Sequence, residues 1–211
     1  LFKIIVKENH FCIAYFFLMI MFLNIPLVSG VVPGKDQSFW TPDRLTCLEK
    51  LVYFNECSSR PEKLISWRED EDFPSLGIGH FIWYPAEKKG PFSESFPGLL
   101  LFLKENGIKI PDEFEKGPPW PNREEFEKDS SSERMLDLRN FLEQTRGLQI
   151  QFIVNRMDQV LPKMLDATIK EKHEHIKNNF DLVAQAPNGM IAMIDYVNFK
   201  GEGTSLTERL K

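Results

Sequence analysis

The sequence predicts an α+β protein that is mostly helical and has one small antiparallel sheet near residues 64–84. Two observations support this class. Apolar residues recur at helical spacing through most of the chain after residue 40, whereas residues 64–84 show the short alternating pattern of strands. The strands form one early group and do not alternate with helices, so a parallel βα arrangement is not expected. We expect roughly seven helices around this sheet.

The first helix has a clear start signal after an extended stretch over residues 31–40. Thr41 suits the N-cap, Pro42 the first helical position, and Asp43 the first turn, where an acid is favourable. Apolar residues then follow at helical spacing, at Leu45, Leu48, Leu51 and Val52. These residues predict a helix that ends at about Asn55 or Glu56.

Residues 64–84 predict two or three short strands around an acidic turn. The stretch begins with LISW, continues with the charged run REDED at 68–72, and ends with SLGIGHFIWY. Gly77 and Gly79 lie on one face of the strand pattern, where side chains would block the approach of a neighbouring segment or a ligand.

Helical signals return after Pro85. A helix is predicted over residues 96–106 and closed by Gly107, followed by a proline-rich loop at 117–121. Capping-box spacings run from Asn122 to Glu125 and from Ser130 to Glu133 and predict two further helix starts. Three more helices are expected at 148–165, where Pro162 predicts a break or kink, and at 169–185 and 189–200.

The N-terminal segment has the layout of a secretory signal. Residues 11–23 are all apolar, Lys3 and Lys7 precede them, and small residues stand at the expected cleavage site after Gly30. The alternative is an uncleaved membrane anchor, since the apolar stretch reaches about 18 residues when 24–28 are included. Either way we expect an exported protein, periplasmic or secreted, with one domain over residues 31–211. The last residues, 205–211, resemble the first turn of another helix, so we expect this domain to be truncated at its C-terminus.

The charge of the chain argues against nucleic acid as a partner. The net charge is −5, and residues 1–30 contribute +1, so residues 31–211 carry −6. No stripe of Lys and Arg interrupts this acidity, whereas nucleic-acid affinity comes largely from neutralising phosphates. Contact with a membrane is expected only through an uncleaved N-terminal segment.

The cysteines and histidines predict neither a disulfide framework nor a metal site. Cys47 and Cys57 lie ten residues apart on one predicted helix, about 15 Å, too far to form a bridge. His173 and His175 do not converge on one helix face and are expected to be solvated. We therefore expect no metal, and we expect a monomer without a cofactor.

The best candidate for acid–base chemistry is Glu56. It stands where an apolar helix ends beside Cys57, so partial burial would raise its pKa and make it a usable general acid. The alternative is a solvated glutamate at a helix end. A second carboxylate from the acidic turn, facing Glu56 across a cleft, would complete the pair that cleaves glycosidic bonds; the four acids of that turn are Glu69, Asp70, Glu71 and Asp72.

This segment resembles the active-site region of the lysozyme-like superfamily, most closely the phage-type lysozymes. The resemblance rests on Glu56 at the end of the first helix, on the short acidic hairpin, and on Ser75-Leu76-Gly77-Ile78-Gly79-His80. Residues 189–203, GMIAMIDYVNFKGEG, are similar to a late helix of the same family.

The resemblance implies a role for each of these residues. Glu56 would protonate the leaving oxygen, Glu69 would be the second carboxylate with Glu71 as the alternative, and Ser75 would hold the attacking water. Gly77, Gly79 and His80 would lie beside the substrate, with His80 orienting the hairpin rather than carrying a proton. The late helix would contribute Tyr196 and Asn198 to the cleft.

Aromatic residues near the acids are candidates for stacking on sugar rings. Trp67, Trp83 and Tyr84 flank the acidic turn in sequence, and Trp120 lies in the proline-rich loop, where it could form an outer subsite. The alternative for the first three is that they pack the hairpin against the helices.

Together these features predict a glycosidase that cleaves β-1,4 linkages of an N-acetylhexosamine polymer, peptidoglycan or a chitin-like glycan. Carboxyl groups about 6.5–9.5 Å apart would predict inversion and about 5 Å retention. Two alternatives stay open. One is a non-catalytic glycan-binding or inhibitor-like module on the same fold, and the other is a lytic transglycosylase, which needs no second carboxylate.

Overall fold

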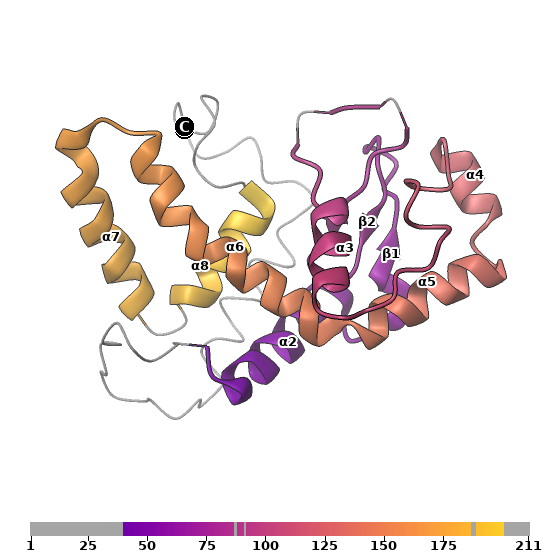
Figure 1. The fold of residues 1–211 in the computed structure, drawn as a ribbon, viewed down its shortest axis with the longest axis horizontal. Helices are drawn as coiled ribbons and strands as arrows, with labels where there is room; N and C mark the ends of the chain where they lie inside the picture. Colours follow the sequence, from indigo (N-terminus) through magenta and orange to yellow (C-terminus); the bar gives the residue numbers. More distant parts are fainter. Residues whose placement is uncertain (1–39, 87, 91, 187–188, 201–211) are drawn as a thin grey trace, which may run out of the picture. The chain divides into compact units, whose positions relative to one another are not determined.

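The computed structural model describes residues 40–86, 88–90, 92–186 and 189–200 (Figure 1). The predicted signal at 1–30 and the C-terminal residues 205–211 lie outside the described residues. The chain from Trp40 onward forms one compact unit of helices with a three-stranded antiparallel sheet. The α+β prediction, mostly helical with one small sheet, is confirmed.

The described ranges contain seven α-helices and two short 3-10 helices, close to the predicted number. The α-helices are α2 (Pro42–Cys57), α3 (Phe96–Glu105), α4 (Arg123–Lys128), α5 (Glu133–Gln144), α6 (Arg146–Asp166), α7 (His173–Gln185) and α8 (Gly189–Lys200). The 3-10 helices are η1 (Pro61–Leu64) and η2 (Lys170–Lys172). In the described ranges, no helix combines the length and the apolar character needed to cross a membrane.

Side-chain caps account for where several helices begin. Thr41 Oγ1 accepts a hydrogen bond from the Arg44 N–H at the start of α2, and Asn122 caps α4 as predicted. The predicted cap of α5 at Ser130 is wrong by two residues. Ser130 still closes the turn after α4, with its N–H donating to the Glu127 carbonyl, and Ser132 caps α5 instead.

The sheet consists of three strands of two residues each, β1 (Ile65–Ser66), β2 (Ser75–Leu76) and β3 (Phe81–Ile82). Ile65 pairs with Leu76 and Ser75 pairs with Ile82, so the order is β1-β2-β3 with antiparallel neighbours. The acidic residues occupy the loop between β1 and β2. Residues 77–80 form the tight turn between β2 and β3, which we call the glycine turn.

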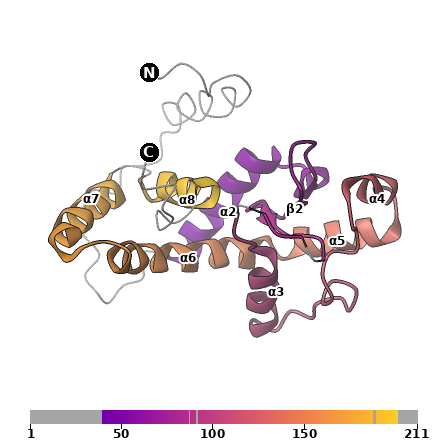
Figure 2. The same ribbon diagram turned by 90° about the horizontal axis from the view of Figure 1, so that it is seen from above.

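Helix α6 is the element against which the others pack. It contacts α2, α3, α5, α7 and α8, and Figure 2 shows it passing between α2 and α3. The helix continues across Pro162 to Asp166, so Pro162 does not break it. Because Pro162 lies in the penultimate turn, its missing N–H leaves only the carbonyl of Asp158 without its helical donor.

The core is rich in aromatic side chains from the hairpin and the loop after it. Trp83 packs against Phe96 and Phe114, with ring centroids 4.8 and 6.4 Å away. Trp120 packs edge-on against Phe126 at 5.0 Å and is buried. The expected surface position of Trp120 is therefore wrong, and its indole N–H donates to the partly exposed Asp129 Oδ2 at 2.6 Å.

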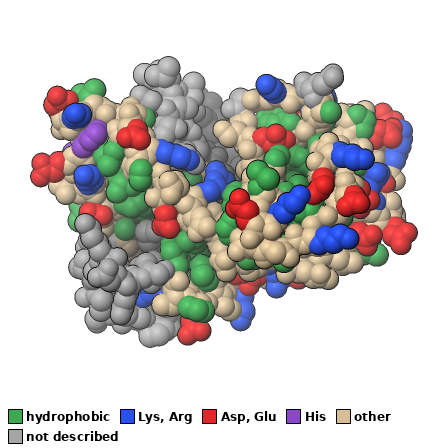
Figure 3. Space-filling view, viewed as in Figure 1, with side chains coloured by type: hydrophobic (Ala, Val, Ile, Leu, Met, Phe, Trp, Pro, Cys, Tyr) green, Lys and Arg blue, Asp and Glu red, His purple; other side chains and the backbone are tan. Residues whose placement is uncertain are grey.

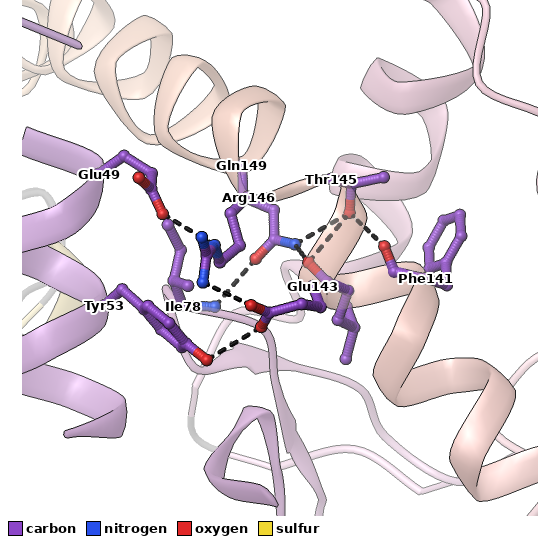
Figure 4. A network of polar contacts seen from close by, with 9 residues as sticks. Glu49, Tyr53, Ile78, Phe141, Glu143, Thr145, Arg146 and Gln149 are labelled. Carbon is purple, nitrogen blue, oxygen red and sulfur yellow. Dashed lines mark hydrogen bonds and ion pairs between the residues drawn. The ribbon is translucent and has the colours of Figure 1, made fainter. Parts of the chain in front are cut away.

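A buried glutamine joins the glycine turn to the start of α6 (Figure 4). The side chain of Gln149 is fully buried, and its Oε1 accepts the Ile78 N–H at 2.9 Å. Its Nε2 donates to the Leu142 carbonyl at 2.7 Å and to Thr145 Oγ1 at 3.0 Å. A Cβ at Gly77 would collide with this Oε1, so the missing side chain makes room for Gln149.

The two described cysteines are free thiols, as predicted. Cys47 is exposed and Cys57 is buried at the end of α2. Burial raises the pKa of Cys57 to about 12, with the neighbouring Glu56 adding to the effect. The Cys57 thiol is therefore protonated and unreactive at neutral pH.

Acidic and basic side chains alternate over the surface. On the face shown in Figure 3, Lys and Arg lie interspersed with Asp and Glu. Several of them form ion pairs, such as Lys104 with Glu115 at 2.9 Å and Lys128 with Glu124 at 2.9 Å. These exposed pairs contribute little to stability, typically below about 1 kcal/mol each.

Substitution of Gly77 by Ala should destabilise the protein strongly. Gly77 has φ +69°, and the added methyl group would also displace Gln149. Gly107 is the matched control, since it has φ +81° but open space around it. We expect Gly107→Ala to lower the free energy of unfolding by about 1 kcal/mol, and Gly77→Ala by about 2 kcal/mol more. Equal losses for both variants in urea unfolding would show that Gln149 does not constrain this position.

Replacement of Asp129 by Asn should destabilise the protein in a pH-dependent way. Burial disfavours the Asp129 carboxylate, but hydrogen bonds from Trp120, Arg134 and Ser132 outweigh it and lower the pKa of Asp129. The stabilisation is thus present above the unfolded pKa of about 3.9 and lost as the pH falls below it through the folded value. At pH 7 we expect the free energy of unfolding of Asp129→Asn to be lower than that of wild type by about 1–3 kcal/mol, as measured by urea unfolding.

The exposed Asp137 on α5 provides the control for this experiment. Asp137→Asn should change stability little at any pH. A stability difference between wild type and Asp129→Asn that stays constant from pH 7 to pH 2.5 would contradict the assignment.

Candidate active site

The structure brings Glu56 and His80 together, although they lie 24 residues apart. Glu56 is in the last turn of α2, and its Oε2 is 3.4 Å from Nδ1 of His80. The side chain of Glu56 is 16% exposed and that of His80 is 28% exposed. The predicted partial burial of Glu56 is confirmed, and the solvated alternative does not describe it.

His80 has an unusual backbone conformation for a residue with a side chain. Its φ is +46°, in the left-handed region, which costs about 1–2 kcal/mol for a non-glycine residue. Its N–H donates to the Gly77 carbonyl at 3.3 Å across the glycine turn. Such strain persists where the surrounding structure imposes it, and it gathers at functional sites.

The imidazole of His80 is neutral at physiological pH. Burial lowers its pKa to about 4, and the positive charges of Arg68 and Lys63 act in the same direction. The expected role of His80, orienting the hairpin rather than carrying a proton, stays a prediction.

Arg68 connects the acidic loop with this pair. Its positive charge lowers the pKa of His80. Its Nε lies 3.1 Å from Asp70 Oδ1 and 3.9 Å from Glu71 Oε1. Sequence reasoning treated Arg68 as part of a charged turn and did not single it out. Arg68 directly precedes the four acids of the loop, and this position could have identified it as their partner.

The two candidates for the second carboxylate differ sharply in environment. Glu69 is 86% exposed and lies 3.5 Å from Nη2 of Arg123. Glu71 is 26% exposed, and its Oε2 is buried without a hydrogen-bond donor among the described residues. Burial raises the pKa of Glu71, and the Arg68 cation offsets this only in part. Glu71 is the better placed of the two for chemistry that needs a desolvated carboxylate.

The other residues predicted from the hairpin are mostly enclosed by protein. Ser75 is buried in β2 opposite Ile82. A Cβ at Gly79 would collide with the ring of Phe81, so the glycines of this turn accommodate neighbouring protein groups.

The aromatic candidates form part of the core. Trp67, Trp83 and Tyr84 are all buried, and the Trp67 indole N–H donates to the Glu71 carbonyl at 2.8 Å. In this structure they pack the hairpin, which is the alternative stated for them. Tyr196 and Asn198 fall within α8, but their side chains lie outside the described residues.

A partly buried charge network that sequence reasoning missed connects α2 to the junction of α5 and α6 (Figure 4). Arg146 lies between two carboxylates, with Nε 2.8 Å from Glu49 Oε1 and Nη1 2.6 Å from Glu143 Oε1. Its guanidinium also stacks 4.1 Å from the Tyr53 ring centroid, and the Tyr53 hydroxyl donates to Glu143 Oε2 at 2.9 Å. Burial and the Glu143 carboxylate raise the pKa of Tyr53 to about 12.

A groove of about 270 Å³ lies beside this network, between the starts of α2 and α6. It is lined by Pro42, Leu45, Thr46, Glu49, Gly147, Ile150 and Gln151, none of which was predicted for the site. Within the described ranges, no three His, Cys, Asp or Glu side chains gather as metal ligands would.

The candidate site therefore consists of Glu56 and His80 in contact, with Arg68 and Glu71 on the loop beside them. This arrangement places a half-buried acid in contact with an imidazole, and the loop after β1 carries Arg68 beside the partly desolvated carboxyl group of Glu71. No protein-family model, curated protein or solved structure matches this chain.

Proposed function

We propose that the protein is an exported glycosidase that cleaves β-1,4 linkages in an N-acetylhexosamine polymer, with peptidoglycan as the foremost substrate. The observation that carries the proposal is the contact of half-buried Glu56 with His80. These are the first and last residues of the segment that resembles phage-type lysozymes. The contact joins the end of α2 to the glycine turn, the two parts of the chain that carry the resemblance.

Glu56 acts as the general acid in this proposal. Partial burial disfavours the charged form of a carboxyl group, which keeps a proton available for the leaving oxygen. The neutral His80 ring occupies one side of the carboxyl without supplying a positive charge that would favour its ionisation. In this proposal Glu56 donates its proton to the leaving oxygen of the substrate.

Glu71, and not Glu69, is the second carboxylate in this proposal. Glu69 is solvated and placed beside Arg123, whereas one oxygen of Glu71 is already desolvated and without a donor. Arg68 lies close enough to Glu71 and His80 to link them electrostatically. Glu71 would stabilise the positively charged transition state or position water, and Ser75 would hold that water.

A lytic transglycosylase is the second candidate function. The contact between Glu56 and a neutral imidazole does not by itself require a second carboxylate, and this class needs only the acid. A non-catalytic binding module is less favoured, because burial of Trp67, Trp83 and Tyr84 leaves those rings without a face for stacking on sugars.

Replacement of Glu56 by Gln should abolish cleavage of purified peptidoglycan sacculi. The amide keeps the shape of the side chain but has no acidic proton to donate, so we expect a loss of about 10²- to 10⁴-fold in kcat. Exposed Glu62, in η1 six residues further along, is the control, and Glu62→Gln should retain full activity.

The products of the wild-type protein distinguish the two catalytic candidates. Hydrolysis adds water and leaves reducing ends, whereas a transglycosylase leaves anhydro-sugar ends that mass spectrometry detects. Glu56→Gln protein that releases products at the wild-type rate would end both proposals. Binding of chito-oligosaccharide with no product from the wild type would select the binding module.

Replacement of Glu71 by Gln should lower kcat by about 10- to 100-fold, whereas Glu69→Gln should leave it unchanged. Because the pKa of Glu71 is raised, its carboxylate is lost as the pH falls toward that value. The acidic limb of the wild-type pH profile should therefore lie above about 4.3, the ordinary value for Glu. The limb should disappear in Glu71→Gln and persist in Glu69→Gln.

The stability of the same two variants provides an independent check. A carboxylate with a raised pKa opposes folding when it is charged, so Glu71→Gln should unfold at the same or a higher urea concentration than wild type at pH 7. Loss of activity in Glu69→Gln, with Glu71→Gln active, would reverse the assignment of the second carboxylate.

A further inference from the structure

We propose that Gln149 is the positioning residue of this site, which holds the glycine turn so that His80 meets Glu56. The inference rests on the proposed function for its catalytic consequence, although the placement of His80 can be tested without any activity. Gln149 touches neither Glu56 nor His80 in the contacts described above. It acts through the backbone of Ile78.

The orientation of the Gln149 amide is determined by its partners. Nε2 faces two acceptors, the Leu142 carbonyl and Thr145 Oγ1, so Oε1 points the other way, toward the Ile78 N–H. Thr145 is itself held by donating its hydroxyl hydrogen to the Phe141 carbonyl at 2.8 Å. The α5–α6 junction thus presents one fixed acceptor to the glycine turn (Figure 4).

The glycine turn is shaped to receive this acceptor. Ile78 is fully buried, so its N–H needs a partner inside the protein, and Gln149 provides one. Gly77 leaves the space that Oε1 occupies. His80 follows two residues later with its strained positive φ, so a shift at Ile78 would move the imidazole directly.

The position of Glu56 also depends on the α5–α6 junction. Glu56 lies three residues after Tyr53, whose hydroxyl donates to Glu143 on α5. Arg146, the first residue of α6, binds both Glu143 and Glu49 of α2. Residues 143–149 therefore position α2 on one side and the glycine turn on the other, and the distance between Glu56 and His80 depends on both.

The principal test is the variant Gln149→Met, which keeps the size of the side chain and removes its hydrogen bonds. We expect kcat to fall on the order of 10- to 100-fold, with KM within about twofold of wild type. Thr145→Val is the milder second variant, since it removes only one acceptor of the amide. It should change kcat in the same direction by a smaller factor.

Met157→Ala is the control for general destabilisation. Met157 is buried on α6, about 12 Å further along the helix from Gln149. This variant should lose stability in urea unfolding while retaining wild-type kcat. If Met157→Ala at matched stability loses as much kcat as Gln149→Met, the effect is destabilisation and the inference is overturned.

A second readout follows His80 itself by NMR, with its signals assigned by comparison with His80→Asn. In wild-type protein the imidazole should titrate near pH 4, and in Gln149→Met it should titrate closer to the ordinary value of about 6.5 as the turn loosens. The Ile78 amide should also exchange faster with solvent. Neither quantity should change in Met157→Ala.

The outcomes separate this inference from the proposed function. Unchanged His80 titration and Ile78 exchange in Gln149→Met would overturn the positioning role, even if wild-type protein cleaves glycan. If wild-type protein cleaves no glycan, the proposed function falls, and the His80 titration still decides whether Gln149 positions the pair.

Discussion

The hydrogen bond from the buried Ile78 N–H to Gln149 is the interaction on which the hairpin depends. The three strands are only two residues long, so their ladder supplies few hydrogen bonds of its own. A hairpin of this kind needs support from a helix, and α6 provides it through one polar side chain in an otherwise apolar interface. The absence of a side chain at Gly77 and the sharp turn to His80 both follow from that bond.

The network around Arg146 plays the corresponding role for α2. Placing a charge in the interior is costly, and here the guanidinium is compensated by two carboxylates and the face of Tyr53. Glu49, Glu143 and Tyr53 all contact this one guanidinium, so a shift of α2 would disturb several contacts at once. It therefore restricts where α2 can end, and the end of α2 is where Glu56 lies.

The sequence predicts the fold class and the partial burial of Glu56 because both depend on local patterns, such as the Thr41–Pro42 helix start and the apolar helix that ends at Glu56. The contact of Glu56 with His80 is not predicted, since it joins residues 24 positions apart. The identity of the second acid is not local. Glu69 and Glu71 lie two residues apart in an irregular loop, and only the packing of Trp67 and Arg68 decides which becomes buried. Gln149 has no sequence signal, since its partner is 71 residues away. The aromatic candidates were assigned to the site although they belong to the core. Buried rings and sugar-stacking rings cannot be told apart in the sequence.

Two costs to folding lie on the segment from Arg68 to His80. His80 adopts a backbone conformation that a glycine would adopt without penalty, and Glu71 buries an oxygen that no described donor satisfies. A core optimised for stability alone would contain neither feature. Both lie on the segment that contacts Glu56 through His80. Costs of this kind are common at functional sites, which supports the proposal that Glu56 acts in proton transfer.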